Sequence, residues 1–479
     1  MLFNSLEFLL FFPLTTILYF LFPHKYRWLL LLVASCIFYM AFIPAYILIL
    51  FFTIVIDYIA GIVIENATLK KRKTFLIISI LANVLVLAIF KYYNFFIENV
   101  NELFHSFGIS TQSLPLLNII LPIGLSFHTF QAMSYTIEVY RGNQRAERHF
   151  GIYSLYVMFY PQLVAGPIER PQNLLHQFKE KHFYSSRHLL DGLRLMLWGF
   201  FKKLVIADRL SQYVDIVYNS PGDFHYLNLI IATLFFAVQI YCDFSGYSDI
   251  AIGAAKTMGF DLMTNFNRPY FSKNIQEFWK RWHISLSTWF KDYLYIFLGG
   301  NRHGIKRMYL NVSIVFLVSG FWHGANWTYI MWGALHTLFI ITYMLYHQYS
   351  KIKFPKNILS NALGIFTTFL LVSFAWIFFR AGSISDAFLV VKNIITLNDN
   401  TIFASVLTDK HTLSEFGITS IVIGVIMAII MFLIEIKLPP GLQTLDKKPL
   451  LNVAFCTFTF SLIILLGVFA KESFIYFQF

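Results

Sequence analysis

The stretches Phe278-Trp-Lys-Arg-Trp-His-Ile-Ser-Leu-Ser287 and Ser319-Gly-Phe-Trp-His-Gly-Ala-Asn-Trp327 decide how the rest of the chain is interpreted. Each holds a histidine that directly follows a tryptophan, His283 in the first and His323 in the second. The segment between them begins with a glycine-containing basic turn, Leu298–His303, and continues as an apolar run. Because an ionisable group in an apolar run must be withdrawn from water at a considerable cost, both histidines are candidate functional residues.

The composition of the chain is that of a membrane protein. Of its 479 residues, 57% are hydrophobic and only 13% are charged, whereas soluble domains carry about 25% charged residues. Apolar segments long enough to cross ~30 Å of hydrocarbon recur from end to end, and no polar linker divides them. We therefore expect an all-α fold, a polytopic bundle of transmembrane helices in which residues 1–479 form a single membrane-embedded domain.

The charged and sulfur-containing residues exclude several other classes of protein. The net charge of +12 comes from lysines and arginines in short loops beside apolar spans, where they set topology, so we expect no nucleic-acid partner. The three cysteines (Cys36, Cys242 and Cys456) show no CxxC spacing, and the fourteen histidines form no HExxH motif, so we expect neither disulfides nor a metal site. The chain also lacks a GxSxG elbow and a Walker A loop, which disfavours a serine hydrolase and an ATP-driven pump.

The apolar segments predict successive crossings of the membrane, with the basic loops in the cytoplasm and both termini outside it. The predicted spans are Phe8–Phe22, Trp28–Phe42, Tyr46–Val63, Phe75–Phe96, Leu116–Val139, Leu227–Ala255, two spans within Met308–Tyr346, Leu359–Phe379, Ile418–Ile436 and Val453–Ala470. The range Leu189–Val217 is expected to form an amphipathic entry followed by a further crossing.

The segment Tyr153–Ile168 does not fit this alternation, because basic loops flank both of its ends. It contains Pro161, Gly166 and Pro167, which free backbone groups that lipid cannot satisfy. We expect a re-entrant segment packed against protein. The alternative is a short helix lying along the membrane surface.

Acidic residues also interrupt one predicted span. Asp243 and Asp249 lie with two serines in the middle of the apolar segment Leu227–Ala255, and Lys202-Lys203 interrupts Leu189–Val217. Charged groups at membrane depth are expensive unless they face protein or a water-filled cavity, so we expect these acids to point into the bundle.

His323 lies where two predicted spans meet, close to Asn326 and to the small residues Gly320 and Gly324. A neutral imidazole at such a position could take the proton of an acceptor hydroxyl as it attacks an acyl carbonyl. The alternative is a core histidine that is satisfied by a backbone carbonyl.

His283 lies in a stretch with helical periodicity that is rich in tryptophan and basic residues. One interpretation is an interfacial amphipathic helix whose lysine and arginine heads reach the membrane surface. The functional interpretation is a cationic cytoplasmic mouth that collects the phosphates of a thioester such as acetyl-CoA; the basic residues concerned are Lys280, Arg281, Lys291, Arg302, Lys306 and Arg307. The candidate donor- or acceptor-binding residues are Trp279, Lys280, Arg281, Trp282, Ser285, Trp289, Asp292, Tyr293, Trp322 and Asn326.

Seven motifs of the chain carry a family resemblance. They are Leu121-Pro-Ile-Gly-Leu-Ser-Phe127, Phe159-Tyr-Pro-Gln-Leu-Val-Ala-Gly-Pro-Ile168, Asp243-Phe-Ser-Gly-Tyr-Ser-Asp249, Asn265-Phe-Asn-Arg-Pro-Tyr270, Phe278–Ser287, Asp292-Tyr-Leu-Tyr-Ile296 and Ser319-Gly-Phe-Trp-His-Gly324. With these motifs the chain resembles the membrane-bound O-acyltransferase (MBOAT) family, and within it the bacterial branch that acetylates polysaccharides such as alginate and peptidoglycan.

The resemblance implies a helical bundle with re-entrant segments and a central funnel, in which His323 matches the family's essential histidine and His283 its second characteristic histidine. It also implies acetyl transfer from cytoplasmic acetyl-CoA, a substrate rather than a bound cofactor, to an extracytoplasmic cell-envelope polysaccharide. An esterase-like SGNH transferase outside the bacterial cytoplasmic (inner) membrane is the expected partner. The alternatives are D-alanyl transfer, acylation of a lipid or protein on the same fold, and a transporter of acyl donors in which the acids and histidines form a relay.

Overall fold

The computed structural model describes residues 1–108, 113–119, 121–164, 166–350, 357–397, 417–438, 442, 448–469 and 474. Within these residues all regular structure is helical, which confirms the all-α prediction. Seven of the described helices are long and apolar enough to cross a membrane. The chain divides into two compact units, residues 1–193 with 251–263 and residues 194–250 with 264–479.

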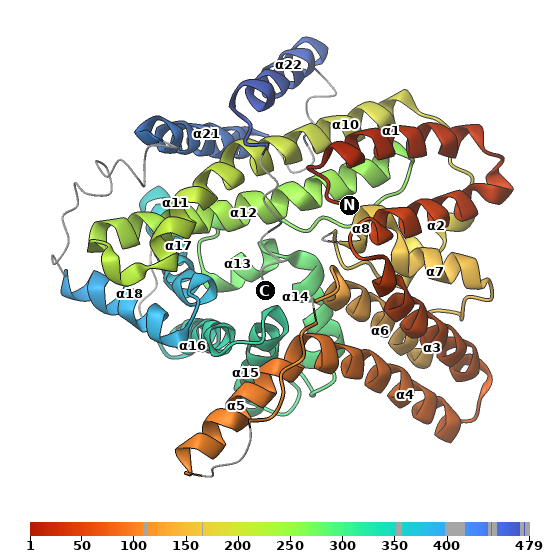
Figure 1. Ribbon diagram of the computed structural model, residues 1–479, viewed down its shortest axis with the longest axis horizontal. Helices are drawn as coiled ribbons and strands as arrows, with labels where there is room; N and C mark the ends of the chain where they lie inside the picture. Colours follow the sequence, from red (N-terminus) through yellow and green to blue (C-terminus); the bar gives the residue numbers. More distant parts are fainter. Residues whose placement is uncertain are drawn as a thin grey trace. The chain divides into compact units, whose positions relative to one another are not determined.

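The first unit is built from short and long helices in chain order (Figure 1). They are α1 (Leu6–Leu21), α2 (His24–Met40), η1 (Pro44–Tyr46), α3 (Ile47–Asn66), α4 (Leu69–Leu87), η2 (Ala88–Tyr92), α5 (Tyr93–Ser106), α6 (Leu125–Arg141), α7 (Phe150–Met158), α8 (Tyr160–Leu163), α9 (Pro171–Leu174) and η3 (Gln177–Lys179).

Helices α3, α4 and α6 pack side by side around a small polar cluster. The carboxyl of Asp57, a fully buried residue, accepts hydrogen bonds from the Asn83 amide at 2.9 and 3.1 Å and lies 2.6 Å from the Ser79 hydroxyl. The Ser79 hydroxyl is also 2.9 Å from that of Thr136 on α6. Polar groups in apolar helices thus satisfy one another, which specifies how the three helices pack.

Two predictions for this unit differ in outcome. The prediction of one helix from Leu116 to Val139 was wrong in its first part, because α6 begins only at Leu125. Pro115 and Pro122 interrupt any earlier helix, and Gly124 adopts a left-handed φ of 72° at the start of α6. The stretch Tyr153–Ile168, in contrast, breaks into α7 and α8, which confirms that it forms no single crossing helix.

The second unit holds the remaining helices. They are η4 (Phe201–Ala207), α11 (Asp208–Asn219), η5 (Pro221–Asp223), η6 (Pro269–Phe271), α13 (Ile275–Arg281), α14 (Ile284–Phe290), η7 (Lys291–Tyr295), α15 (Ile305–His323), α16 (Trp327–Tyr349), α17 (Ile358–Arg380), α18 (Ile384–Thr396), α21 (Gly417–Lys437) and α22 (Pro449–Leu466). Two helices, α10 (Ser186–Phe200) and α12 (Tyr226–Thr257), have residues in both units.

The charged residues that interrupt the predicted spans pair with one another inside the second unit. The π-helical segment η4 directs Lys203 between Asp208 and Asp243, with nitrogen–oxygen distances of 2.7 and 2.9 Å. The neighbouring Lys202 forms an ion pair with Asp249 at 2.5 Å. The prediction that these acids face protein is therefore confirmed, and the ion pairs satisfy both lysines at membrane depth.

Helices α15 and α16 form a hairpin whose turn follows His323 directly (Figure 1). The Asn326 side chain accepts a hydrogen bond from the Thr328 amide at 3.0 Å and so begins α16. Gly320 and Gly333 bring the two helices close, because a Cβ at either position would collide with a carbonyl of the facing helix. This confirms that Met308–Tyr346 contains two helices that meet near His323.

Candidate functional site

His283 occupies a strained backbone position at the start of α14. It adopts a left-handed φ of 43°, which is unusual for a residue with a side chain, and its side chain is fully buried. Backbone strain of this kind persists where the surrounding structure holds it in place and is concentrated at functional sites. Here the Ile284 amide donates to the Asn265 carbonyl at 2.9 Å, which anchors the turn.

Asn265 determines which nitrogen of His283 carries the proton. The Asn265 amide nitrogen donates to Ser248 at 3.1 Å, so its oxygen faces the histidine. This oxygen accepts from the Ser285 hydroxyl at 2.9 Å and lies 3.1 Å from His283 Nδ1. Since an amide oxygen only accepts, Nδ1 is the protonated nitrogen and Nε2 is the basic one.

His283 is neutral under ordinary conditions. It lies outside the helices that are long and apolar enough to span a membrane, and burial lowers the pKa of its imidazole to about 3. Desolvation disfavours the charged form, so the ring stays available as a base or hydrogen-bond acceptor at physiological pH.

His323 is the last residue of α15, and its side chain is buried within a cage of aromatic rings. The ring centroids of Trp332 and Phe379 lie 5.1 and 5.3 Å from that of His323, both in edge-to-face geometry. Such contacts hold the imidazole in one orientation.

Trp322 joins the two histidines predicted from the sequence. Its ring centroid is 4.9 Å from that of His323 and 6.3 Å from that of His283. The structure therefore brings His283 and His323 to the same indole, although neither contacts the other through a described hydrogen bond.

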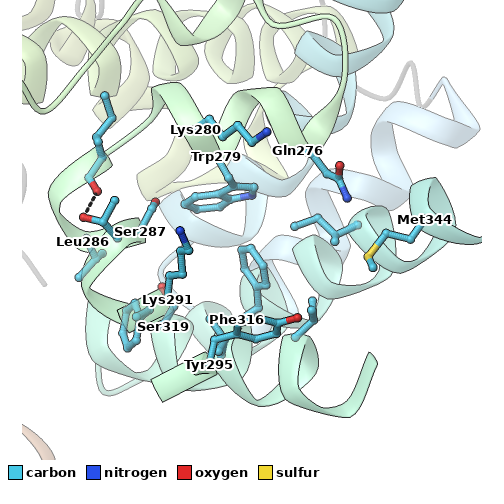
Figure 2. Close-up of a pocket in the computed structure, with 16 residues that line it drawn as sticks. Gln276, Trp279, Lys280, Leu286, Ser287, Lys291, Tyr295, Phe316, Ser319 and Met344 are labelled. Atoms are coloured by element: carbon cyan, nitrogen blue, oxygen red, sulfur yellow. Dashed lines mark hydrogen bonds between the residues drawn. The ribbon is translucent and has the colours of Figure 1, made fainter. Parts of the chain in front are cut away.

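A mostly apolar pocket of about 530 Å³ lies among α13, α14, η7, α15 and α16. Its lining includes Trp279, Lys280, Lys291 and Phe316. Figure 2 shows the Trp279 indole in the wall above Phe316, with the Lys291 side chain directed toward that indole. The pocket thus combines an aromatic wall with two amino groups.

The pocket adjoins both histidines along the chain. Ile284, the residue after His283, is part of the lining, and so is Ser319. Ser319 precedes His323 by one turn on α15, and residues four positions apart lie on the same face of a helix. One end of a molecule held in the pocket would consequently lie close to His283 and His323, which together with Trp322 we call the histidine cluster.

The other predicted site residues have varied surroundings. Trp279 and Lys280 line the pocket, whereas Trp282 is buried against Phe278 and Trp376. Arg281 pairs with Glu277 at 2.6 Å, and Asn326 caps α16. Trp289 and Tyr293 contact each other at 5.1 Å between ring centroids, and these two residues, with Asp292, are outside the described lining of the pocket.

Two residues of the site were missed in the sequence. Asn265 belongs to a motif that carries the resemblance, but nothing in its spacing links it to His283. His336, in α16, is fully buried, and its Nδ1 accepts a hydrogen bond from the Trp279 indole nitrogen at 3.3 Å. Its signal was available, because it is an ionisable residue within the apolar run Met308–Tyr346.

No group of three or more His, Cys, Asp or Glu side chains in the described part of the chain is arranged to hold a metal ion.

Comparison with known proteins identifies the family. Residues 148–379, which include the histidine cluster and the pocket, match the model of the membrane-bound O-acyltransferase family. The chain is 40% identical over 394 residues to the probable alginate O-acetylase of Pseudomonas aeruginosa, which covers 81% of this chain and 73% of that protein. It is 36% identical over 399 residues to the peptidoglycan O-acetyltransferase of Helicobacter pylori, covering 78% and 74% of the two chains. The teichoic acid D-alanyltransferase of Bacillus subtilis is more distant, at 29% identity over 55% of this chain and 70% of its own. The chain belongs to the membrane-bound O-acyltransferase family and is a multi-pass membrane O-acyltransferase.

Proposed function

We propose that the protein transfers an acetyl group from cytoplasmic acetyl-CoA for the O-acetylation of an extracytoplasmic cell-envelope polysaccharide. The similarity to an alginate O-acetylase and a peptidoglycan O-acetyltransferase, each over most of both chains, supports acetyl as the group and a polysaccharide as the acceptor. The observation that carries the proposal is a pair of buried histidines around one indole, beside an apolar pocket with two lysines.

The pocket suits the arm of a thioester donor. Its apolar wall would exclude bulk water from a reactive acyl group, which limits hydrolysis. Lys280 and Lys291 are exposed residues and would attract the phosphates at the other end of the donor. The remaining lysines and arginines of the segment 302–307 would extend this positive field.

His323 is the general base in this mechanism. An acceptor hydroxyl gives its proton to the imidazole while its oxygen forms a bond to the thioester carbonyl carbon. The carbon–sulfur bond then breaks, and the leaving thiolate takes up the proton that the imidazole holds. His283, whose Nδ1 proton is held by Asn265, offers Nε2 as an acceptor that orients the hydroxyl or the donor.

The surroundings of the reaction are also part of the proposal. We place the protein in the bacterial cytoplasmic membrane with both termini outside, because its basic loops then face the cytoplasm. An SGNH-type esterase-like partner on the outer side would receive the acetyl group and pass it to the polysaccharide.

D-alanyl transfer is the second candidate. It is favoured by the relative named teichoic acid D-alanyltransferase, and a basic pocket mouth would suit an acidic carrier protein as well as acetyl-CoA. The lower identity and shorter coverage of that relative make it the less supported function.

The two functions are separated by donor choice. Purified protein in proteoliposomes would receive radiolabelled acetyl-CoA or a radiolabelled D-alanyl thioester carrier on the cytoplasmic side, with an SGNH partner and glycan outside. Label reaching the glycan from acetyl-CoA alone is the expected result. Transfer only from the D-alanyl carrier would overturn the proposed function. The exposed-site variant His105→Ala controls for handling of the protein, since His105 lies on the surface of α5.

A further inference from the structure

We infer that His336 is a positioning residue of the donor pocket: its Nδ1 holds the indole of Trp279 in the pocket wall. The inference rests on the proposed function in one respect, which is that the pocket receives the acyl donor. The hydrogen bond and the packing that carry it are independent of what the donor is.

The bond between Trp279 and His336 has a defined direction. An indole N–H can only donate, so the 3.3 Å contact makes His336 Nδ1 the acceptor and leaves the proton on Nε2. The two residues are 57 positions apart, on α13 and α16. Through this bond a residue of a transmembrane helix fixes a ring on the short helix that bears the pocket wall.

Aromatic rings restrain the His336 imidazole from several sides. The centroids of Trp279 and Trp332 lie 4.9 and 4.8 Å away at steep interplanar angles, and Phe316 lies nearly parallel at 6.1 Å. Because His336 is fully buried among these rings, it cannot rotate its Nδ1 away from the indole without disturbing the cluster. The acceptor is therefore preorganised.

His336 acts on the pocket only through Trp279. The described lining of the pocket includes Trp279 and Phe316, whose rings contact each other at 5.1 Å, but not His336. If the hydrogen bond is lost, the half-buried indole can turn about its side-chain bonds and occupy space that the donor needs. The main expected effect is weaker donor binding, with a smaller effect on the chemical step.

A second ring contact links His336 to His323. The ring centroid of Trp332 lies 4.8 Å from that of His336 and 5.1 Å from that of His323. A substitution that keeps the volume of His336 should leave both of these contacts in place. Conservative variants are thus the right test, because they separate the hydrogen bond from the packing.

Substitution of His336 by asparagine or by glutamine tests the two ring nitrogens separately. The side-chain amide of His336→Asn reaches about the position of Nδ1 and can accept from the indole, whereas that of His336→Gln reaches about the position of Nε2. We expect KM for acetyl-CoA to rise about fivefold in His336→Gln, the effect of one lost neutral hydrogen bond, with kcat nearly unchanged. We expect His336→Asn to stay within about twofold of wild type, as an acceptor is retained.

A double-mutant cycle tests the pairing itself. Trp279→Phe removes the indole N–H, so its effect on KM should not add to that of His336→Gln. The matched control is His347→Asn, an exposed position on the same helix, which should leave KM and kcat unaltered.

The same variants can overturn the inference. If His336→Asn and His336→Gln lower kcat equally and change the pH–rate profile, His336 takes part in proton transfer and is not a positioning residue. If His336→Gln keeps the wild-type KM, or if the two substitutions are fully additive, the hydrogen bond does not set the pocket wall. The same double-mutant cycle can be measured by thermal unfolding in detergent, without any donor. If the two substitutions are coupled in unfolding but the protein shows no activity on acetyl-CoA, the proposed function is wrong and the pairing of His336 with Trp279 still holds.

Discussion

The Nδ1 atom of His283 and the side-chain oxygen of Asn265 lie 3.1 Å apart, and this contact fixes the imidazole with its basic Nε2 turned away from Asn265. Ser248 and Ser285 hold the amide of Asn265 in its orientation, at 3.1 and 2.9 Å. The tautomer of a buried histidine is therefore specified by residues on three different segments of the chain.

This relationship predicts a pH dependence in the variant Asn265→Asp. In the wild type, burial lowers the pKa of His283 to about 3, so His283 gives no acid limb at physiological pH. A carboxylate beside Nδ1 would raise that pKa, because it stabilises the imidazolium. Protonated Nε2 cannot accept a hydrogen bond, so transfer should fall as the pH drops through the raised pKa. The rate–pH profile of acetyl transfer measures this. A profile with the shape of the wild type would contradict the assigned role of Asn265, and Asn301→Asp, in an exposed turn, is the matched control.

The lysines of the pocket predict a salt-sensitive donor affinity. Removing both charges in Lys280→Gln/Lys291→Gln should raise KM for acetyl-CoA by roughly three- to tenfold, a modest effect because both lysines are exposed. The wild-type KM should rise with ionic strength, and the double variant should lose most of that dependence. Steady-state kinetics at several salt concentrations give the answer. Equal salt dependence in the two proteins would show that the phosphates bind elsewhere, and Lys392→Gln, at an exposed lysine of α18 outside the pocket lining, serves as the control.

Phe474, the last described residue of the chain, packs against Phe244, which in turn contacts His283. It is 1% exposed, and its ring lies 4.4 Å from that of Tyr247 and 5.7 Å from that of Phe244. Phe244 in turn meets His283 edge to face at 4.6 Å. We expect Phe474→Ala to destabilise the protein by about 3 kcal/mol, as for other buried aromatic truncations, and to lower kcat. Thermal unfolding in detergent and kinetics measure both effects. Phe469→Ala, at a ring that is 62% exposed, should change neither, and an equal loss in the two variants would refute the connection.

The polar cluster of the first unit predicts that Asp57 tolerates loss of its charge. The single proton of the Ser79 hydroxyl cannot satisfy both Asp57 and Thr136, which lie 2.6 and 2.9 Å away. If Asp57 is a neutral acid, it donates to Ser79, Ser79 donates to Thr136, and Thr136 donates to the Met133 carbonyl at 3.1 Å. The neutral variant Asp57→Asn, which supplies an N–H donor, should therefore be nearly as stable as wild type.

Removal of the whole group should have a different effect. Asp57→Ala removes the carboxyl that the buried Asn83 amide and Ser79 hydroxyl contact and should cost about 1–3 kcal/mol. Thermal unfolding of the two variants in the same detergent compares them. Equal destabilisation by Asn and Ala would argue that a charged carboxylate is required.

Several features of the fold could be predicted because apolar pattern and charge placement act locally. The two helices around His323 followed from a run too long for one span, and the inward direction of Asp243 and Asp249 followed from the cost of charge in lipid. The start of α6 at Leu125 could also have been found, since Pro115 and Pro122 precede it. The prediction of a helix over Leu116–Val139 instead followed the apolar character of that stretch.

The site itself was predictable only in part. His283 and His323 stand out because each is ionisable, follows a tryptophan and lies beside apolar residues. Their relation through Trp322, and the bonds of Asn265 and His336, depend on which helices pack together, and no local pattern encodes such contacts. Asn326 shows the opposite case. Its polar side chain belongs to the motif Ser319–Trp327, and in the structure it begins α16 and donates a hydrogen bond to the Gly382 carbonyl at 3.1 Å.

The most direct test of the central claim is the initial rate of acetyl transfer by His323→Gln. Glutamine keeps a polar group of similar size in the ring cage but cannot act as a base, so transfer from labelled acetyl-CoA should fall at least about 100-fold in folded protein. A conduit that only passes the donor would tolerate this change. A rate within about threefold of wild type, measured beside the exposed control His105→Gln, would contradict the assignment of His323 as the catalytic base.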